Sequence, residues 1–187
     1  MALTYTPDTH NHTHCPNFAL KGMDEKKHSL NDFNDSKALV VLFICNHCPY
    51  VKAIESRIIQ LAQEMKNQGI QFIAICSNDP NDNQEDSFKN LQKNWQDKNF
   101  NFPYLIDETQ QVAKDFGAVC TPDIFVYENS NGTFPLFYRG RLDDSWKNES
   151  LVKKQELKEA LLNILEDQPL PQEAIPSMGC SIKWIES

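Results

Sequence analysis

The sequence predicts a single α/β domain built on a central mixed sheet flanked by helices. Residues 38–44 and 70–76 are apolar runs rich in β-branched side chains, which is typical of strands buried on both faces of a sheet. Between them, apolar residues recur at helical spacing from Ile54 to Met65, and Gly69 is a natural end for that helix. Strand, helix and strand in this order form a β-α-β unit.

The second half of the chain alternates further strands and helices, separated by turn residues. The expected elements are a helix through Phe88, Leu91 and Trp95, a strand at 104–106, a helix that ends at Gly117, a strand at 124–127, a turn at 129–132, an antiparallel strand at 134–139, and an amphipathic helix from near Ser150 to Leu165. Because this hairpin is antiparallel and the first unit is parallel, we expect a mixed sheet.

The chain has 187 residues, which is room for one domain of ordinary size. We expect residues 1–14 to be a flexible tail, residues 15–166 to form the domain, and residues 167–187 to be an extended C-terminal arm. The arm contains three prolines and shows no helical or strand period. We expect it to pack on the domain through apolar residues near its end, namely Ile182, Trp184 and Ile185.

The charge balance excludes several classes of partner. The chain has 18 basic and 26 acidic side chains, so its formal net charge is −8, and nothing suggests binding to nucleic acid or anionic lipid. No apolar run is long enough for a membrane span, and the first residues show no secretory signal pattern. A cytoplasmic location is therefore expected, where cysteines stay reduced unless they react or bind metal.

Three alternating histidines, His10, His12 and His14, stand just before Cys15. Such a tract can bind soft metals, but a solvated tail is the simpler interpretation.

A C-x-x-C motif lies where the first strand meets the following helix. It reads Cys45-Asn46-His47-Cys48 and is followed by Pro49 in the first turn. The exposed N–H groups and the dipole of a helix N-terminus stabilise a thiolate, and a second thiol nearby allows an intramolecular disulfide. In a cytosolic protein beside a β-α-β unit, this motif favours redox chemistry.

Two other interpretations of the motif stay open. Cys45 could be a buried core residue. Cys45, His47 and Cys48 could also bind zinc, although a structural zinc site needs a fourth ligand and the sequence contains no second pair at ligand spacing.

A second notable segment, Cys120-Thr121-Pro122, leads directly into the strand at 124–127. A proline at the entrance to a strand either marks a sheet edge or adopts the cis form. Composition alone favours the trans form.

The chain resembles the thioredoxin-like superfamily in several stretches. The most specific are FICNHCPYVK and AVCTPD, and supporting ones are CPNFALKGMDEKKHSLNDF, YRGRLDD and PSMGCSIKW. The resemblance is to its alkyl hydroperoxide reductase/thiol-specific antioxidant branch, and more closely to a peroxiredoxin-like group described as probable thiol-disulfide isomerases. It covers most of the chain from Cys15 onward and implies a thioredoxin fold.

The resemblance also implies roles for individual residues. Cys48 corresponds to the nucleophilic cysteine, and Pro122 to a cis-proline that faces it. Thr121 would then offer its backbone to a substrate chain as an added strand. Cys120 would lie near Cys48.

The chain departs from both related groups. Val51 occupies the position of the second thioredoxin cysteine, and Cys45 occupies the position at which peroxiredoxins carry Thr or Ser. The second thiol of the reaction is therefore Cys45, Cys120 or another cysteine, and we rank Cys45 slightly ahead of Cys120.

We expect a thiol-disulfide oxidoreductase in which Cys48 attacks a disulfide and a second cysteine closes an internal disulfide. No organic cofactor or metal is required, and a dithiol would donate electrons. The alternatives are an antioxidant peroxidase for hydroperoxides and a non-enzymatic zinc or partner-binding module. The oligomeric state stays open, with a homodimer allowed.

Four further residues have two interpretations each. His47 either donates to the Cys48 thiolate or faces solvent. Arg139 and Arg141 either reach the active site or pair with the nearby Asp143 and Asp144, and local pairing is favoured. Cys180 either folds back as an exchange partner or anchors the tail, and packing is favoured.

Overall fold

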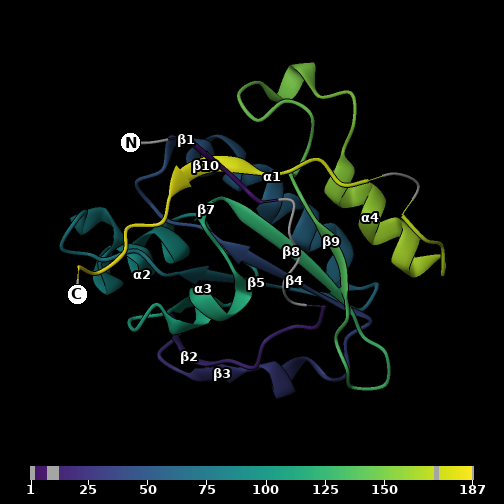
Figure 1. Cartoon of the computed structure of the whole chain (residues 1–187), viewed down its shortest axis with the longest axis horizontal. Coiled ribbons are helices and arrows are strands. Elements are labelled where there is room, and N and C mark those ends of the chain that lie inside the picture. Colours follow the sequence, from purple (N-terminus) through teal and green to yellow (C-terminus); the bar gives the residue numbers. More distant parts are fainter. Residues whose placement is uncertain (1–2, 8–12, 171–172, 187) are drawn as a thin grey trace.

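The computed structural model describes residues 3–7, 13–170 and 173–186. In this part of the chain, helices lie on both faces of a central mixed sheet, which confirms the predicted α/β class (Figure 1). Among these residues, none of the helices combines the length and the hydropathy that crossing a bilayer requires.

The central sheet has seven strands within the described residues. Their spatial order is β3 (Lys27–Ser29), β2 (Ala19–Gly22), β6 (Tyr104–Ile106), β5 (Ile70–Cys76), β4 (Ala38–Phe43), β8 (Asp123–Glu128) and β9 (Leu136–Arg139). Strands β4, β5 and β6 run parallel, whereas β8, β9, β2 and β3 pair antiparallel with their neighbours. The short β2–β3 hairpin is an addition that the sequence analysis does not predict.

Each face of the sheet is covered by helices. The described helices are α1 (Pro49–Lys66), α2 (Phe88–Asp97), α3 (Gln111–Phe116) and α4 (Glu156–Leu165), with 3-10 turns η1 (Leu30–Phe33), η2 (Gln84–Asp86) and η3 (Glu149–Leu151). Side chains alternate along β4, so Val40 and Leu42 pack with α1 and α4, while Val41 and Phe43 pack with α3. This two-sided burial explains the continuous apolar run of β4.

The last helix begins later than expected, at Glu156 rather than near Ser150. The Asn148 side chain accepts the backbone N–H of Ser150, and Val152 is extended, so residues 149–151 make only a 3-10 turn.

A second, three-stranded sheet joins both ends of the described chain. It consists of β1 (Leu3–Tyr5), β10 (Met178–Ser181) and β7 (Cys120–Thr121), in that order. Figure 1 shows β10 lying between β1 and β7, close to the start of α1.

This sheet includes part of the expected flexible tail and part of the expected extended arm. Residues 3–5 are held as a strand, with Leu3 opposite Cys180, and residues 178–181 form the central strand. These strands are only three and four residues long, too short for a periodic signal in the sequence, so their pairing with distant segments defines them. His10 and His12, two of the three alternating histidines, lie outside the described residues, and His14 is exposed beside Thr13.

The arm packs on the domain largely through backbone contacts. Ile182 is buried as expected, whereas Trp184 and Ile185 are 41% and 50% exposed. The N–H of Ile185 donates to the Gln110 side chain, at 2.8 Å, and the N–H of Lys183 donates to the Asn78 side chain, at 2.9 Å. Hydrogen bonds to Gln110 and Asn78 therefore hold the end of the arm on the domain, where the sequence analysis expects apolar packing.

Candidate active site

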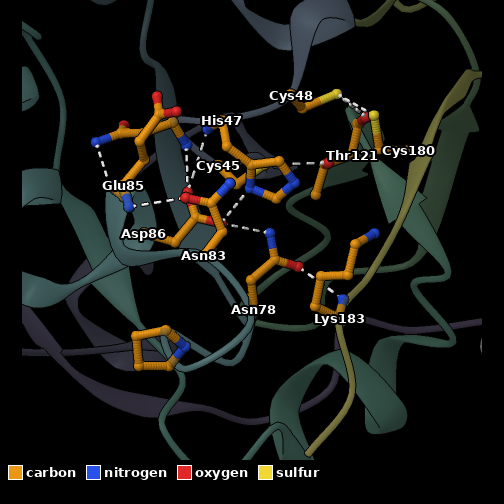
Figure 2. Close-up of polar contacts among 12 residues, drawn as sticks. Cys45, His47, Cys48, Asn78, Asn83, Glu85, Asp86, Thr121, Cys180 and Lys183 are labelled. Carbon is orange, nitrogen blue, oxygen red and sulfur yellow. Dashed lines mark hydrogen bonds and ion pairs between the residues drawn. The ribbon is translucent and has the colours of Figure 1, made fainter. Parts of the chain in front are cut away.

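Cys48 is the N-cap residue of α1, where the predicted strand-to-helix junction places it. Its side chain is fully buried, and Pro49 fills the first helical position, where a missing N–H costs nothing. The thiol lies 3.0 Å from the backbone oxygen of Thr121 and 3.1 Å from the Sγ atom of Cys180 (Figure 2).

The surroundings of Cys48 favour its thiolate. A hydrogen bond from the Cys45 thiol lowers the pKa of Cys48 to about 5, against the effect of burial. Further hydrogen bonds from Cys180 and from the backbone N–H of Val51 act in the same direction. On ionisation, Cys48 therefore exchanges its contact with a carbonyl oxygen for donors that stabilise an anion.

The two neighbouring thiols keep their protons. The hydrogen bond to Cys48, followed by burial, raises the pKa of Cys45 well above its ordinary value. Burial, followed by the hydrogen bond to Cys48, raises the pKa of Cys180 to about 12. One anion and two thiol donors thus share a single cluster, which is a suitable arrangement for thiol exchange.

The peptide bond between Thr121 and Pro122 is cis, as the resemblance implies and against the composition-based expectation. Thr121 directs its backbone oxygen at Cys48, and its hydroxyl lies 3.3 Å from the Sγ atom of Cys45. Residues 120–121 pair antiparallel with β10, which puts Cys180 directly opposite Thr121.

His47 is buried beside the thiols, contrary to the solvent-facing alternative. Its Nδ1 atom lies 2.6 Å from Oδ2 of Asp86, whose carboxylate also accepts the backbone N–H of Asn46 and the side-chain amide of Asn78. The hydrogen bond to Asp86 raises the pKa of His47, against the effect of burial. Figure 2 shows this network next to the thiol cluster; His47 thus anchors the loop before α1.

Sequence comparison identifies the family of this chain. The model of the AhpC/TSA family matches residues 12–133. The chain belongs to the AhpC/TSA family.

Two solved structures resemble this AhpC/TSA-family protein over its whole length. An uncharacterised conserved protein from Geobacillus kaustophilus is 38% identical, with a TM-score of 0.92, covering 100% of this chain and 98% of the other. A hypothetical protein from Sinorhizobium meliloti 1021 is 32% identical, with a TM-score of 0.90, covering 98% of this chain and 100% of the other.

A more distant match comes from a thiol:disulfide interchange protein, a thioredoxin-family protein of Chlorobium tepidum. It is 17% identical, with a TM-score of 0.63, over 82% of this chain and 96% of the other. Comparison with curated proteins gives no match. The chain therefore has a thioredoxin fold, and its family supports a thiol-based redox function.

Cys120 does not join the thiol cluster. Successive side chains of β7 point to opposite sides, so the Cys120 thiol points away from the side on which Thr121 contacts Cys45. Its Sγ atom lies 3.9 Å from the hydroxyl of Thr6 and 3.5 Å from the oxygen of Pro122, and burial raises its pKa. Cys180, which the sequence analysis assigns to packing, is the thiol that contacts Cys48. A strand signal around Met178–Ser181 would have been needed to find it, and the sequence shows none.

Arg139 and Arg141 of this AhpC/TSA-family protein do not pair with Asp143 and Asp144, contrary to the favoured expectation. Arg139 pairs with the buried Asp123 at 2.9 Å, and Arg141 pairs with Glu156. Asp143 instead pairs with Arg57. Proximity in the sequence predicted the wrong partner for Arg139, because β9 pairs with β8 and places Arg139 next to that strand.

Among the residues that the structure describes, one group of side chains could hold a metal ion. Ligand atoms of Cys45, His47 and Asp86 lie within 4.8 Å of one another, and the Nε2 atom of His47 is buried without a hydrogen-bond partner. Asp86 here replaces Cys48 in the ligand set that the sequence suggested. Three ligands of this kind suit a catalytic rather than a structural zinc site.

Proposed function

We propose that this protein is a thiol-disulfide oxidoreductase with Cys48 as the nucleophile. The proposal rests on the pairing of strand β10 with Thr121. A segment of extended chain, β10, pairs with this backbone and places a sulfur atom 3.1 Å from the Cys48 sulfur. A disulfide-bearing peptide added to the same edge would place its sulfur there as well.

The reaction starts from the Cys48 thiolate. It attacks one sulfur of the substrate disulfide, forms a mixed disulfide, and releases the other sulfur as a thiolate. A second thiol of the chain then attacks Cys48 and releases the rest of the substrate. The enzyme's two thiols supply the two electrons, and an external dithiol restores them.

The remaining site residues position the reacting sulfur and the substrate. Thr121 and Pro122 provide the backbone edge for an extended substrate. Pro49 starts α1 directly after Cys48, and His47 holds the preceding loop through Asp86.

A turnover assay tests this proposal. The protein is mixed with oxidised glutathione or insulin, with dithiothreitol as electron donor, and turnover is compared with that of Cys48→Ser. We expect turnover in the wild type and only the uncatalysed rate in the variant. Cys15→Ser is the matched control, because Cys15 packs with the apolar cluster on the opposite face of the sheet. Equal rates in wild type and Cys48→Ser would refute the role of Cys48.

A peroxidase is the second candidate, because a thiolate with a pKa of about 5 also attacks hydroperoxides. Cys48 would then become a sulfenic acid before a second thiol attacks it. The groups around Cys48 favour it less, since Arg139 and Arg141 are engaged with Asp123 and Glu156. Stopped-flow measurement of hydrogen peroxide consumption separates the two activities: a rate no better than that of a free thiol eliminates the peroxidase.

A zinc-binding module is the candidate from another class, favoured by the proximity of Cys45, His47 and Asp86. Elemental analysis of protein purified without chelator, combined with a thiol count, tests it. Stoichiometric zinc without turnover of disulfides would replace the redox proposal.

A further inference from the structure

We propose that Cys180 is the resolving cysteine, and that β10 occupies the substrate's strand position whenever no substrate is bound. This inference rests on the proposed function, because it names the second thiol of that reaction. Its geometric basis is the 3.1 Å separation between the sulfur atoms of Cys48 and Cys180, residues 132 positions apart.

The register of β10 places Cys180 at the site. Cys180 lies opposite Thr121 and Ser181 lies opposite Cys120, and the N–H of Ile182 donates to the oxygen of Val119 at 3.1 Å. These are the contacts of an added antiparallel strand, the same mode by which extended peptides bind to sheet edges.

Gly179 allows this close approach. A Cβ atom at this position would lie 2.0 Å from the oxygen of Thr121 and 2.9 Å from the nitrogen of Pro122. No other residue type fits between β10 and the cis peptide bond without displacing the strand. The sequence of β10 is thus adapted to the edge that carries the reaction.

The other two thiols near Cys48 are less suited to resolution. Cys45 also donates to Cys48, but it lies in the buried loop before α1, and its thiol is in contact with the Thr121 hydroxyl at 3.3 Å. Cys120 directs its thiol toward Thr6 instead. Cys180 is carried by a strand whose neighbours are the three-residue β1 and the two-residue β7, so it can separate from Cys48 and return.

Separation is a required step. Cys48 and Cys180 are 0% and 1% exposed, so a substrate disulfide reaches Cys48 only after β10 leaves β7. Substrate and β10 therefore compete for one edge, and the return of β10 completes the reaction.

The Cys48 thiolate forms a bond to one substrate sulfur and the other leaves as a thiolate. When β10 returns, Cys180 loses its proton and attacks Cys48. A Cys48–Cys180 disulfide forms, the bond from Cys48 to the substrate breaks, and the second substrate sulfur leaves with that proton. The two substrate sulfurs gain the two electrons that the enzyme's thiols lose.

Single-turnover mapping with oxidised glutathione tests the inference. Reduced protein is mixed with it, quenched with acid at successive times, and digested for mass spectrometry of disulfide-linked peptides. We expect the wild type to accumulate the Cys48–Cys180 disulfide. In Cys180→Ser the glutathione adduct on Cys48 should persist at least ~100-fold longer, a difference of ~2.7 kcal/mol in activation free energy.

Controls distinguish the alternatives. Cys45→Ser should still form the Cys48–Cys180 disulfide, and Cys15→Ser should match the wild type. Cys180→Ala is a second variant in case serine impairs folding. A Cys45–Cys48 disulfide in the wild type, or clearance of the adduct at the wild-type rate in both Cys180 variants, overturns the inference while leaving the proposed function intact. Absence of any Cys48 adduct or disulfide overturns both.

Discussion

The Nδ1 atom of His47 lies 2.6 Å from Oδ2 of the buried Asp86. Asp86 also accepts the side-chain amide of Asn78, and the Asn78 oxygen accepts the N–H of Lys183 (Figure 2). One carboxylate therefore connects the loop that carries the C-x-x-C motif with the C-terminal arm. These hydrogen bonds run without a break from the loop that precedes Cys48 to the arm that carries Cys180.

Replacing Asp86 by Asn should lower the pKa of His47 and reduce the free energy of unfolding by about 2 kcal/mol, because hydrogen bonds to a charged group are lost. The hydrogen bond to Asp86 raises the pKa of His47, so that part of the stability is lost as pH rises above 6.5. Burial raises the pKa of Asp86, but the hydrogen bonds from His47 and Asn78 outweigh it, so this pKa lies below its ordinary value. The stability that Asp86 contributes is therefore lost as pH falls below 3.8.

The destabilisation should therefore be largest between pH 3.8 and 6.5, the ordinary pKa values of the two groups. Urea denaturation at several pH values, with NMR titration of His47, measures both effects. Asp82→Asn, at an exposed position in the same loop, is the control. A pH-independent loss would contradict this prediction.

Cys48 should titrate with a pKa of about 5, because the Cys45 hydrogen bond stabilises its anion. Thiolate absorbance in the ultraviolet, taken as the difference between wild type and Cys48→Ser, measures this value without requiring a reagent to enter the site. Between its folded pKa and the ordinary value of 9.0, the folded state binds fewer protons than the unfolded state. The contribution of Cys48 to stability therefore rises with pH over that interval. A midpoint near 9 would show that the thiol is unperturbed.

Replacing Gly179 by Ala should displace β10 and expose Cys48. The new Cβ atom would lie 2.0 Å from the Thr121 oxygen, and overpacking of this kind costs roughly 1–3 kcal/mol. Alkylation of Cys48 by iodoacetamide should therefore accelerate by about 10-fold, since 1.4 kcal/mol corresponds to one factor of ten.

Gly132→Ala is the matched control for Gly179→Ala. Gly132 has φ +84°, so alanine strains the turn there, but a Cβ meets nothing within 4 Å. It should lower the melting temperature without accelerating alkylation of Cys48. Equal acceleration in both variants would mean that general unfolding, rather than displacement of β10, exposes the thiol.

Local sequence patterns predicted the part of the site that lies within the first β-α-β unit. The apolar run of β4, Pro49 after Cys48 and the spacing of the C-x-x-C motif all act within one β-α-β unit, and the structure confirms that unit. Thr121 and Pro122 required a family resemblance, because their approach to Cys48 is a long-range contact.

Cys180 shows why the rest was missed. Met178–Ser181 is only four residues long, contains Gly179 and has no β-branched or aromatic side chain, so it has no strand signal of its own. It becomes a strand only because β7 and β1 present unpaired backbone groups on either side. Spacing alone therefore favoured Cys45, three residues from Cys48, over a thiol brought in by the topology.

Replacing Arg139 by Leu should destabilise the fold by roughly 3–5 kcal/mol while leaving the pKa of Cys48 unchanged. Arg139 donates to Asp123 and to the Gly117 oxygen and lies over the Phe125 ring, so its removal leaves a buried carboxylate without its partner. Burial already raises the pKa of Asp123, against the effect of Arg139, and it should rise further. Guanidinium denaturation and the thiolate titration measure the two quantities.

The double variant Asp123→Asn/Arg139→Leu supplies the control. Because it removes both charges, it should recover part of the stability that Arg139→Leu loses. If Arg139 instead stabilised an anion at Cys48, as a peroxidase-like arrangement requires, both variants would raise the pKa of Cys48. An unchanged thiol pKa in both variants, with part of the stability recovered in the double variant, assigns Arg139 to the packing of β8 and β9, whose pairing joins Phe125 to Arg139.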